Sequence, residues 1–368
     1  MAFEGLRGLA ALLVVFYHVA AFEYWDTTLN QYGLFRNGWL AVDIFFVLSG
    51  FVMYYVYGGS ADARNAVSFA IRRFGRLYPL HFVTLVAFVG VAFAIRLAIR
   101  LHWSATLGGG LDTRFLWFSP RELVSNVFLV HSLGVNQRLT LNVPSWSISV
   151  EFWTYLVFFL TLLLTSGGRR ILAWLTIVTG SVAVLLLQTR YKDLEGLHHD
   201  YGFFRCLFGF FLGALLVPLR QRVAPRATVL PAVAARNWIA IAQVPVFVGV
   251  CLAVIFAHRW PAATFFYPFA FATLVFFLAQ DEGPVAHLLK TRPCLYLGKI
   301  SYSVYLTHFT LLTVFGAIAN GKAGRDAAWL TPLYGVSVIA VSDLTYRYIE
   351  VPWREKFRRL ADRYRAPA

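Results

Sequence analysis

Ten long apolar runs are the feature that most constrains this chain. They lie near residues 9–22, 39–57, 78–99, 148–165, 171–188, 203–219, 238–257, 264–279, 296–319 and 329–349. A helix needs about 20 mostly apolar residues to cross a bilayer. Because the bilayer offers no water to unpaired backbone groups, such segments span it as helices. The pattern therefore predicts an all-α fold, a polytopic integral membrane bundle of about ten transmembrane helices.

Composition agrees with this prediction, since 59% of the 368 residues are hydrophobic and only 14% are charged. Soluble domains have about 45–50% apolar and about 25% charged residues. These values exclude a soluble enzyme, a disordered chain and a disulfide scaffold. Between the apolar runs, the only long segment is roughly 100–147, so we predict a single membrane-embedded domain over residues 1–368 with no appended soluble domain.

The net charge of +15 would suggest nucleic acid in a soluble protein. In a membrane protein, Lys and Arg instead mark the cytoplasmic loops. With both termini in the cytoplasm, the cytoplasmic segments carry 18 Lys and Arg residues and the opposite loops carry 10. We therefore predict a multi-pass protein of the bacterial inner (plasma) membrane with both termini cytoplasmic, whose partner is the lipid bilayer and not nucleic acid.

An ionisable side chain within a membrane span is costly, so each one needs a reason. The first candidate is His18, which lies eleven residues after Arg7. Eleven helical steps place both side chains on one face, about 16 Å apart along the axis. With Arg7 at the cytoplasmic boundary, His18 lies near the middle of the membrane. The alternative is an arginine that extends to the interface and a histidine bonded to a nearby carbonyl.

Two acidic residues also lie in apolar surroundings. Asp43 is a lone acid within 38–50, and it requires a His or Arg partner from another helix. A purely structural ion pair is the alternative. Glu151 follows Ser147 by four residues, which gives the entry of that span a polar face. Helix capping explains a serine there, but it does not explain a glutamate one turn deeper.

A cluster of arginines precedes the third apolar run. Arg73 and Arg76 are three residues apart, so they are neighbours on a helical face, and Arg72 is adjacent to them. Forked guanidinium groups at this position suit phosphate groups. The alternative is a plain cytoplasmic anchor. On a later span, Tyr305 and His308 share one face, and a hydrogen-bonded core histidine is as consistent with this pattern as a functional one.

Taken together, these motifs resemble the acyltransferase-3 family of integral membrane O-acyltransferases. The resemblance extends in family order over nearly the whole chain. It rests on the Arg-x10-His pattern of 6–18, the segment 45–50 after Asp43, the Arg73-x-x-Arg76 pair, the Ser-x-Ser-x-Glu stretch ending at Glu151, and the segments 301–308 and 348–353.

The resemblance implies an acyl-CoA donor, usually acetyl-CoA, taken from the cytoplasm. It implies acyl transfer to a hydroxyl group, commonly of a sugar in a glycan, glycolipid or polysaccharide, although some members modify small molecules such as antibiotics. The family histidine corresponds to His18, and the donor-side arginines correspond to Arg73 and Arg76. Many members carry a further C-terminal hydrolase-like domain, so a separate extracytoplasmic partner enzyme is one expectation for this chain.

These considerations give a hypothesis for the site. His18 acts as general base on the acceptor hydroxyl, or as a nucleophile that is itself acylated. Asp43 or Glu151 orients the imidazole. The predicted catalytic residues are His18, Asp43 and Glu151. The predicted donor-binding residues are Arg7, Arg72, Arg73 and Arg76. Further candidates are His308, Tyr305 and Ser147.

The rival class is a transporter or flippase, in which charged spans are equally typical. The sequence has no inverted repeat and no paired broken helices in corresponding halves, which argues against that class. Nor do the candidate residues have metal-ligand spacing, so no metal is expected. The identity of the acceptor stays open.

Overall fold

The structure is a computed structural model that describes residues 1–59, 65–101, 113–223, 232–319, 327 and 329–364. Over these residues the chain forms α-helices joined by short 3₁₀ and π turns, without a β-strand. The helices are α1 (Ala2–Phe22), α2 (Gly33–Arg36), α3 (Ala41–Tyr57), α4 (Ala66–Arg100), α5 (Pro120–Val127), α6 (Ser145–Leu164), α7 (Gly167–Leu187), α8 (Gly202–Val223), α9 (Ala232–Phe256), α10 (Tyr267–Leu278), α11 (Pro284–Leu289), α12 (Arg292–Ala319), α13 (Leu330–Thr345) and α14 (Val351–Asp362).

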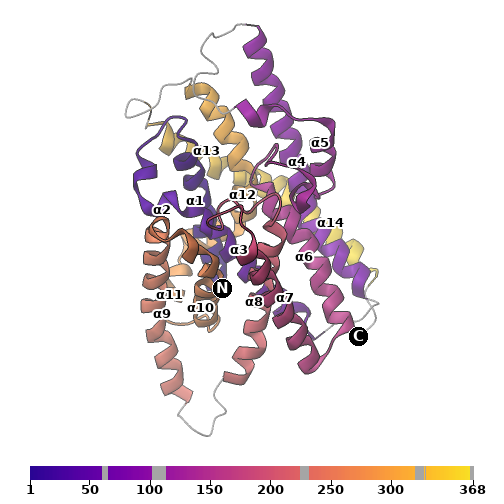
Figure 1. The fold of residues 1–368 in the computed structure, drawn as a ribbon, viewed down its shortest axis with the longest axis vertical. Helices are drawn as coiled ribbons and strands as arrows, with labels where there is room; N and C mark the ends of the chain where they lie inside the picture. Colours follow the sequence, from indigo (N-terminus) through magenta and orange to yellow (C-terminus); the bar gives the residue numbers. More distant parts are fainter. Residues whose placement is uncertain (60–64, 102–112, 224–231, 320–326, 328, 365–368) are drawn as a thin grey trace.

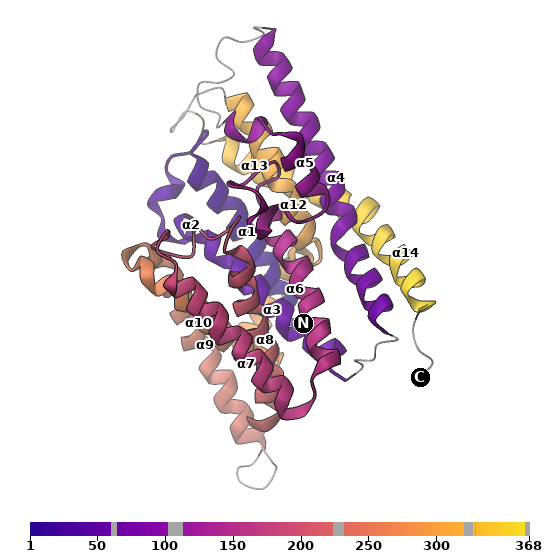
Figure 2. The same cartoon turned by 45° about the vertical axis from the view of Figure 1, so that its right-hand side comes forward.

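The long helices form one elongated bundle, in which α4 and α9 lie at opposite sides (Figures 1 and 2). Within the described residues, nine helices are long and apolar enough to cross a membrane. This confirms the predicted all-α membrane bundle. Large apolar side chains on α4, α7 and α9 face outward, where a bilayer would cover them.

The last predicted span, 329–349, differs most from the structure. Helix α13 has only 16 residues and is followed by a π-helical turn, Tyr346–Glu350, and then by α14. Sixteen helical residues extend about 24 Å, which is less than the roughly 30 Å of hydrocarbon in a bilayer. This segment therefore spans a membrane only together with the π turn.

The arginine cluster also lies differently from the prediction. Helix α4 begins at Ala66 and continues through Pro79, so Arg72, Arg73 and Arg76 lie within the helix rather than before it.

Close packing of small residues brings the functional helices together. A Cβ atom on Gly8 of α1 would lie 2.6 Å from the backbone nitrogen of Gly298 on α12. On α8, a Cβ atom on Gly213 would lie 1.9 Å from the carbonyl oxygen of Val47 on α3. Glycines of this kind let membrane helices approach closely. The two contacts fix α1 against α12, and α3 against α8.

Candidate active site

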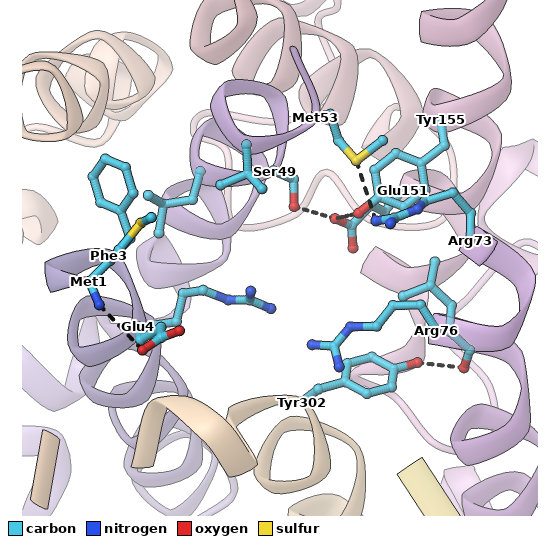
Figure 3. Close-up of a pocket in the computed structure, with 14 residues that line it drawn as sticks. Met1, Phe3, Glu4, Ser49, Met53, Arg73, Arg76, Glu151, Tyr155 and Tyr302 are labelled. Carbon is cyan, nitrogen blue, oxygen red and sulfur yellow. Dashed lines mark hydrogen bonds and ion pairs between the residues drawn. The ribbon is translucent and has the colours of Figure 1, made fainter. Parts of the chain in front are cut away.

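A cavity of about 240 Å³ lies beside the N-terminal part of α1, between α3, α4, α6 and α12. We call it the inner cavity. Figure 3 shows Arg73 and Arg76 on one side of it and Glu4 on the other. Arg7 from α1 completes a set of three guanidinium groups that line the same space. The arginines of two helices far apart in the sequence therefore meet at one cavity.

Arg73 lacks an ion-pair partner among the described residues. Its Nη2 donates to the hydroxyl of Tyr57 at 3.1 Å, and its Nη1 donates to the sulfur of Met53 at 3.4 Å. The guanidinium also lies 5.7 Å from the centre of the Tyr155 ring. Its Nε is buried without a hydrogen-bond partner. A buried, unsatisfied cationic donor beside a cavity favours an anionic ligand.

The other two arginines add to the positive charge. Arg76 forms an ion pair with the buried carboxylate of Glu350, and its guanidinium lies 5.3 Å from the centre of the Tyr302 ring. Arg7 forms neither a hydrogen bond nor an ion pair with any residue in the described part of the chain. Glu4 pairs with the ammonium group of Met1, so three guanidinium groups face the two carboxylates of Glu151 and Glu350, which leaves a positive excess of one charge. An anion such as a phosphate group fits this balance.

Arg72, predicted as a fourth donor-binding residue, does not line the inner cavity. Its guanidinium forms an ion pair with Asp362 at the end of α14. The physical reason is helical geometry, since Arg72 points about 100° away from Arg73 around α4. The structure therefore places Arg72 at the contact between α4 and α14, outside the inner cavity.

Glu151 lies at the inner end of the site. Its carboxylate accepts hydrogen bonds from Ser49 at 2.5 Å and from Tyr155 at 2.6 Å. It lines the inner cavity and also a narrow extension of about 40 Å³. That extension reaches Ser147 and Tyr305, whose hydroxyl oxygens are 2.8 Å apart. Glu151 therefore faces the arginines of the inner cavity. The predicted role, orienting the imidazole of His18, would require it to face that ring instead.

His18 is paired with another histidine. The Nε2 atom of His308 lies 3.3 Å from the Nδ1 atom of His18. The Nδ1 atoms of both rings also contact carbonyl oxygens one turn earlier, those of Val14 at 2.8 Å and of Val304 at 3.1 Å. Because a carbonyl only accepts, this network assigns a proton to each Nδ1. The single N–H at His18 Nδ1 is then shared between the carbonyl of Val14 and His308 Nε2, and His18 Nε2 is left to accept a proton.

Asp43 pairs with Arg205 of α8 rather than with His18. The Nε and Nη2 atoms of Arg205 donate to its two carboxylate oxygens at 2.9 and 2.7 Å. Both side chains are almost fully buried. The guanidinium also donates to the carbonyl of Leu194 at 2.7 Å, and it lies 5.3 Å from the ring centre of Trp146. Arg205 neutralises the charge of Asp43. The observed geometry is therefore that of a structural ion pair, which is the alternative interpretation of Asp43.

Three pairings at this site could not be read from the sequence. The sequence predicts a His or Arg partner for Asp43 without identifying Arg205, although Arg205 is a charged residue at the start of an apolar run. Glu350 is not among the predicted site residues, and the structure buries its carboxylate against Arg76. His308 is a predicted candidate, but nothing in the local sequence indicates that its ring meets His18.

The described residues contain no group of three or more His, Cys, Asp or Glu side chains that could hold a metal ion. The arrangement instead supplies a cationic cavity, a narrow hydroxyl-lined extension and a paired histidine. In chemical terms, it can bind an anion at one end and transfer a proton at the other.

Comparison with known proteins relates this chain to acyltransferases. This chain is 28% identical over 318 residues to BcsY, a Komagataeibacter xylinus protein described as a membrane-bound transacylase. The matched region covers 84% of this chain and 72% of that protein. It is 26% identical over 361 residues to the acyltransferase MdmB of Streptomyces mycarofaciens, with 92% and 85% covered. It is 24% identical over 373 residues to the peptidoglycan O-acetyltransferase OatA of Listeria monocytogenes, with 96% and 55% covered.

The chain therefore spans little more than half the length of OatA. No solved structure matches this chain. The model of one protein family, described as an acyltransferase domain, matches residues 2–347, which is nearly the whole chain. This membrane-embedded chain belongs to the acyltransferase-3 family.

Proposed function

We propose that this protein is a membrane O-acyltransferase that moves an acetyl group from cytoplasmic acetyl-CoA to a hydroxyl group of a carbohydrate acceptor. The observation that carries the proposal is the set of three cationic side chains that line the inner cavity, whose narrow extension ends at Tyr305, next to the pair of His308 and His18. The named relatives include transferases of acetyl groups, which supports acetyl as the group transferred.

The donor would bind with its phosphates at Arg7, Arg73 and Arg76. The buried Nε of Arg73 has no protein partner, and a phosphate oxygen would satisfy it. The pantetheine arm would then extend past Glu151 into the narrow extension, where Ser147 and Tyr305 line the wall. This route places the thioester near the histidine pair, because the ring centres of Tyr305 and His308 lie 6.0 Å apart.

The reaction needs one proton relay. His18 Nε2 takes the proton from the acceptor hydroxyl as its oxygen attacks the thioester carbonyl carbon. The C–O bond forms, the C–S bond breaks, and the leaving thiolate takes the proton from the imidazolium to give CoA-SH and the ester. His308 Nε2 accepts a hydrogen bond from His18 Nδ1 and so stabilises the transient cation. In a variant of this route, His18 Nε2 attacks the thioester carbonyl carbon and the CoA thiolate leaves. The acceptor hydroxyl then attacks the acyl-imidazole and its proton passes to the thiolate, which gives the ester, CoA-SH and free His18.

We further propose one catalytic unit over residues 1–368, in an inner membrane, with both termini in the cytoplasm. Two contacts support a common side for the two ends of the chain. Met1 lines the inner cavity together with Arg73, and the neighbouring Arg72 pairs with Asp362 near the C-terminus. The excess of Lys and Arg in these segments favours the cytoplasm for that side.

The test is donor consumption by purified protein in nanodiscs. Acetyl-CoA should release free thiol only when a hydroxyl-bearing acceptor is present, and the acceptor should gain one acetyl group by mass spectrometry. His18→Ala should abolish both signals while the variant still purifies as a folded protein. Thiol release that is the same in wild type and His18→Ala would refute the assignment, and transport of an acceptor without any acetylation would favour a transporter.

A further inference from the structure

A second cavity, of about 330 Å³, lies near the opposite end of α1 from the inner cavity. We call it the outer cavity. From α1 it is lined by Tyr17 and Ala21, whereas the inner cavity is lined by Phe3, Glu4 and Arg7. Thirteen residues separate Glu4 from Tyr17, which corresponds to about 20 Å along the helix axis. The two cavities therefore lie beside opposite ends of α1.

The histidine pair lies between these cavities, and a tyrosine stands on each side of it. The Tyr17 ring lines the outer cavity and lies 4.9 Å from the His18 ring. The Tyr305 ring lines the inner extension and lies 6.0 Å from the His308 ring. A substrate in the outer cavity would therefore be separated from His18 by one side chain.

The walls of the outer cavity have the opposite charge to those of the inner cavity. Asp193 and Glu195 supply two carboxylates, His258 supplies an imidazole, and Arg36 supplies one guanidinium that is largely exposed. Asn30 and Asn37 add amide groups. Carboxylates accept hydrogen bonds from hydroxyl groups, but they repel other anions. This lining suits a polyhydroxylated molecule without negative charge.

The cavity is held in shape by contacts to its polar wall. Tyr17 donates a hydrogen bond to Glu195 Oε1 at 2.9 Å, which ties α1 to the loop between α7 and α8. The amide of Asn37 donates to the carbonyls of Val254 and Ile255 at 2.8 and 3.2 Å, which ties the other wall to α9. The site is therefore built from three separate parts of the chain.

We infer that the outer cavity is the acceptor site, and that it selects an uncharged, hydroxyl-rich acceptor such as a neutral sugar unit over an anionic one. This inference rests on the proposed acyl transfer for its biological meaning. The binding step does not depend on that transfer. A neutral oligosaccharide binds beside Tyr17, and Glu195 accepts hydrogen bonds from it. Acetylation then requires Tyr17 to move aside, which brings a sugar hydroxyl to His18.

The experiment measures occupancy of the cavity without turnover. Ala21→Cys, in a background with Cys251→Ser and Cys294→Ser, is reacted in nanodiscs with a charged methanethiosulfonate reagent, with no acetyl-CoA present. Cellotetraose and chitotetraose are the neutral probes, and a galacturonic acid tetramer is the anionic probe. The matched control is Gln31→Cys, an exposed position on the same outer segment that does not line the cavity.

We expect at least one neutral tetrasaccharide to slow the labelling of Ala21→Cys and not of Gln31→Cys, and the anionic tetramer to slow neither. Adding Glu195→Gln should raise the sugar concentration needed for protection about tenfold, because a hydrogen bond to a charged group is lost. Asp200→Asn, on the same loop but outside the cavity, should leave it unchanged. Failure of both neutral probes to protect, or equal protection by the anionic tetramer, would overturn the inference.

The outcome separates this inference from the proposed function. Protection by a neutral sugar that is never acetylated would refute acetyl transfer to it and leave the binding site standing. Acetylation of a sugar that gives no protection of Ala21→Cys would support the transferase and place its acceptor elsewhere.

Discussion

His308 Nε2 lies 3.3 Å from His18 Nδ1, although 290 residues separate the two histidines in the sequence. This contact replaces the acidic partner that the sequence predicted for His18. A neutral imidazole in this position can accept a hydrogen bond from His18 Nδ1 without the large desolvation penalty of a buried carboxylate. Because this contact occupies Nδ1 of His18, Nε2 is the nitrogen that can take a proton from the acceptor hydroxyl.

The first prediction concerns His308 as a positioning residue. His308→Ala should lower kcat at least about tenfold, because the hydrogen bond to a transient imidazolium is worth about 1.5–3 kcal/mol. The KM for acetyl-CoA should change little. His308→Gln, whose amide oxygen can accept from His18, should recover part of kcat. Equal activity of the Ala and Gln variants would assign His308 to packing alone.

The second prediction separates two neighbouring arginines. Arg73→Ala should raise the KM for acetyl-CoA about 10- to 100-fold, since it removes a cationic donor from the inner cavity. Arg72→Ala is the matched control, because Arg72 pairs with Asp362 outside that cavity. Its donor KM should match the wild type. Steady-state kinetics with varied acetyl-CoA measure both, and an unchanged KM in Arg73→Ala would return it to the role of a membrane anchor.

The third prediction tests the buried ion pair. Asp43→Asn leaves the Arg205 guanidinium buried without its counter-charge, which should destabilise the protein by about 3–5 kcal/mol. The double variant Asp43→Leu with Arg205→Met should recover most of the loss in thermal unfolding experiments. Its donor KM should be unchanged. If the double variant were stable but catalytically dead, Asp43 would have a role in the reaction itself.

The fourth prediction addresses the contact between α1 and α12. Gly8→Ala should disturb this interface, because the added Cβ atom would lie 2.6 Å from the backbone nitrogen of Gly298. Overpacking of this kind costs about 1–3 kcal/mol, and the shift should also lower kcat by moving His18 relative to His308. Gly90→Ala on α4 is the control, since its Cβ atom would meet open space. Similar melting temperatures and rates for the two variants would contradict this account.

The fifth prediction concerns pH and the helix α5. Burial raises the pKa of Glu122, but hydrogen bonds from Ser119 and Arg138 outweigh it, so the pKa of Glu122 is lowered overall. A carboxylate with a lowered pKa stabilises the folded state above its unfolded value, about 4.3. Hydrogen exchange in α5, corrected for intrinsic rates, should therefore accelerate as pH falls below that value. Glu122→Gln should show less dependence on pH, whereas an identical pH profile would remove Glu122 as the cause.

Much of the fold followed from local properties of the sequence. The apolar runs of α1 and α3 are long enough to require helices, whatever their neighbours are. The last span was harder to predict, because α13 ends in a π turn that places Glu350 against Arg76. Such a turn depends on a contact with α4 that no local pattern records.

The sequence by itself determined that the chain is a helical membrane protein, which residues are costly to bury, and which family the motifs resemble. The reason is that the penalty for a charge in a bilayer belongs to each residue alone. Only the tertiary structure decided the partners: His308 for His18, Arg205 for Asp43, and Asp362 for Arg72. Pairing depends on how distant helices pack, and close glycine contacts such as that of Gly8 with Gly298 fix this packing in three dimensions.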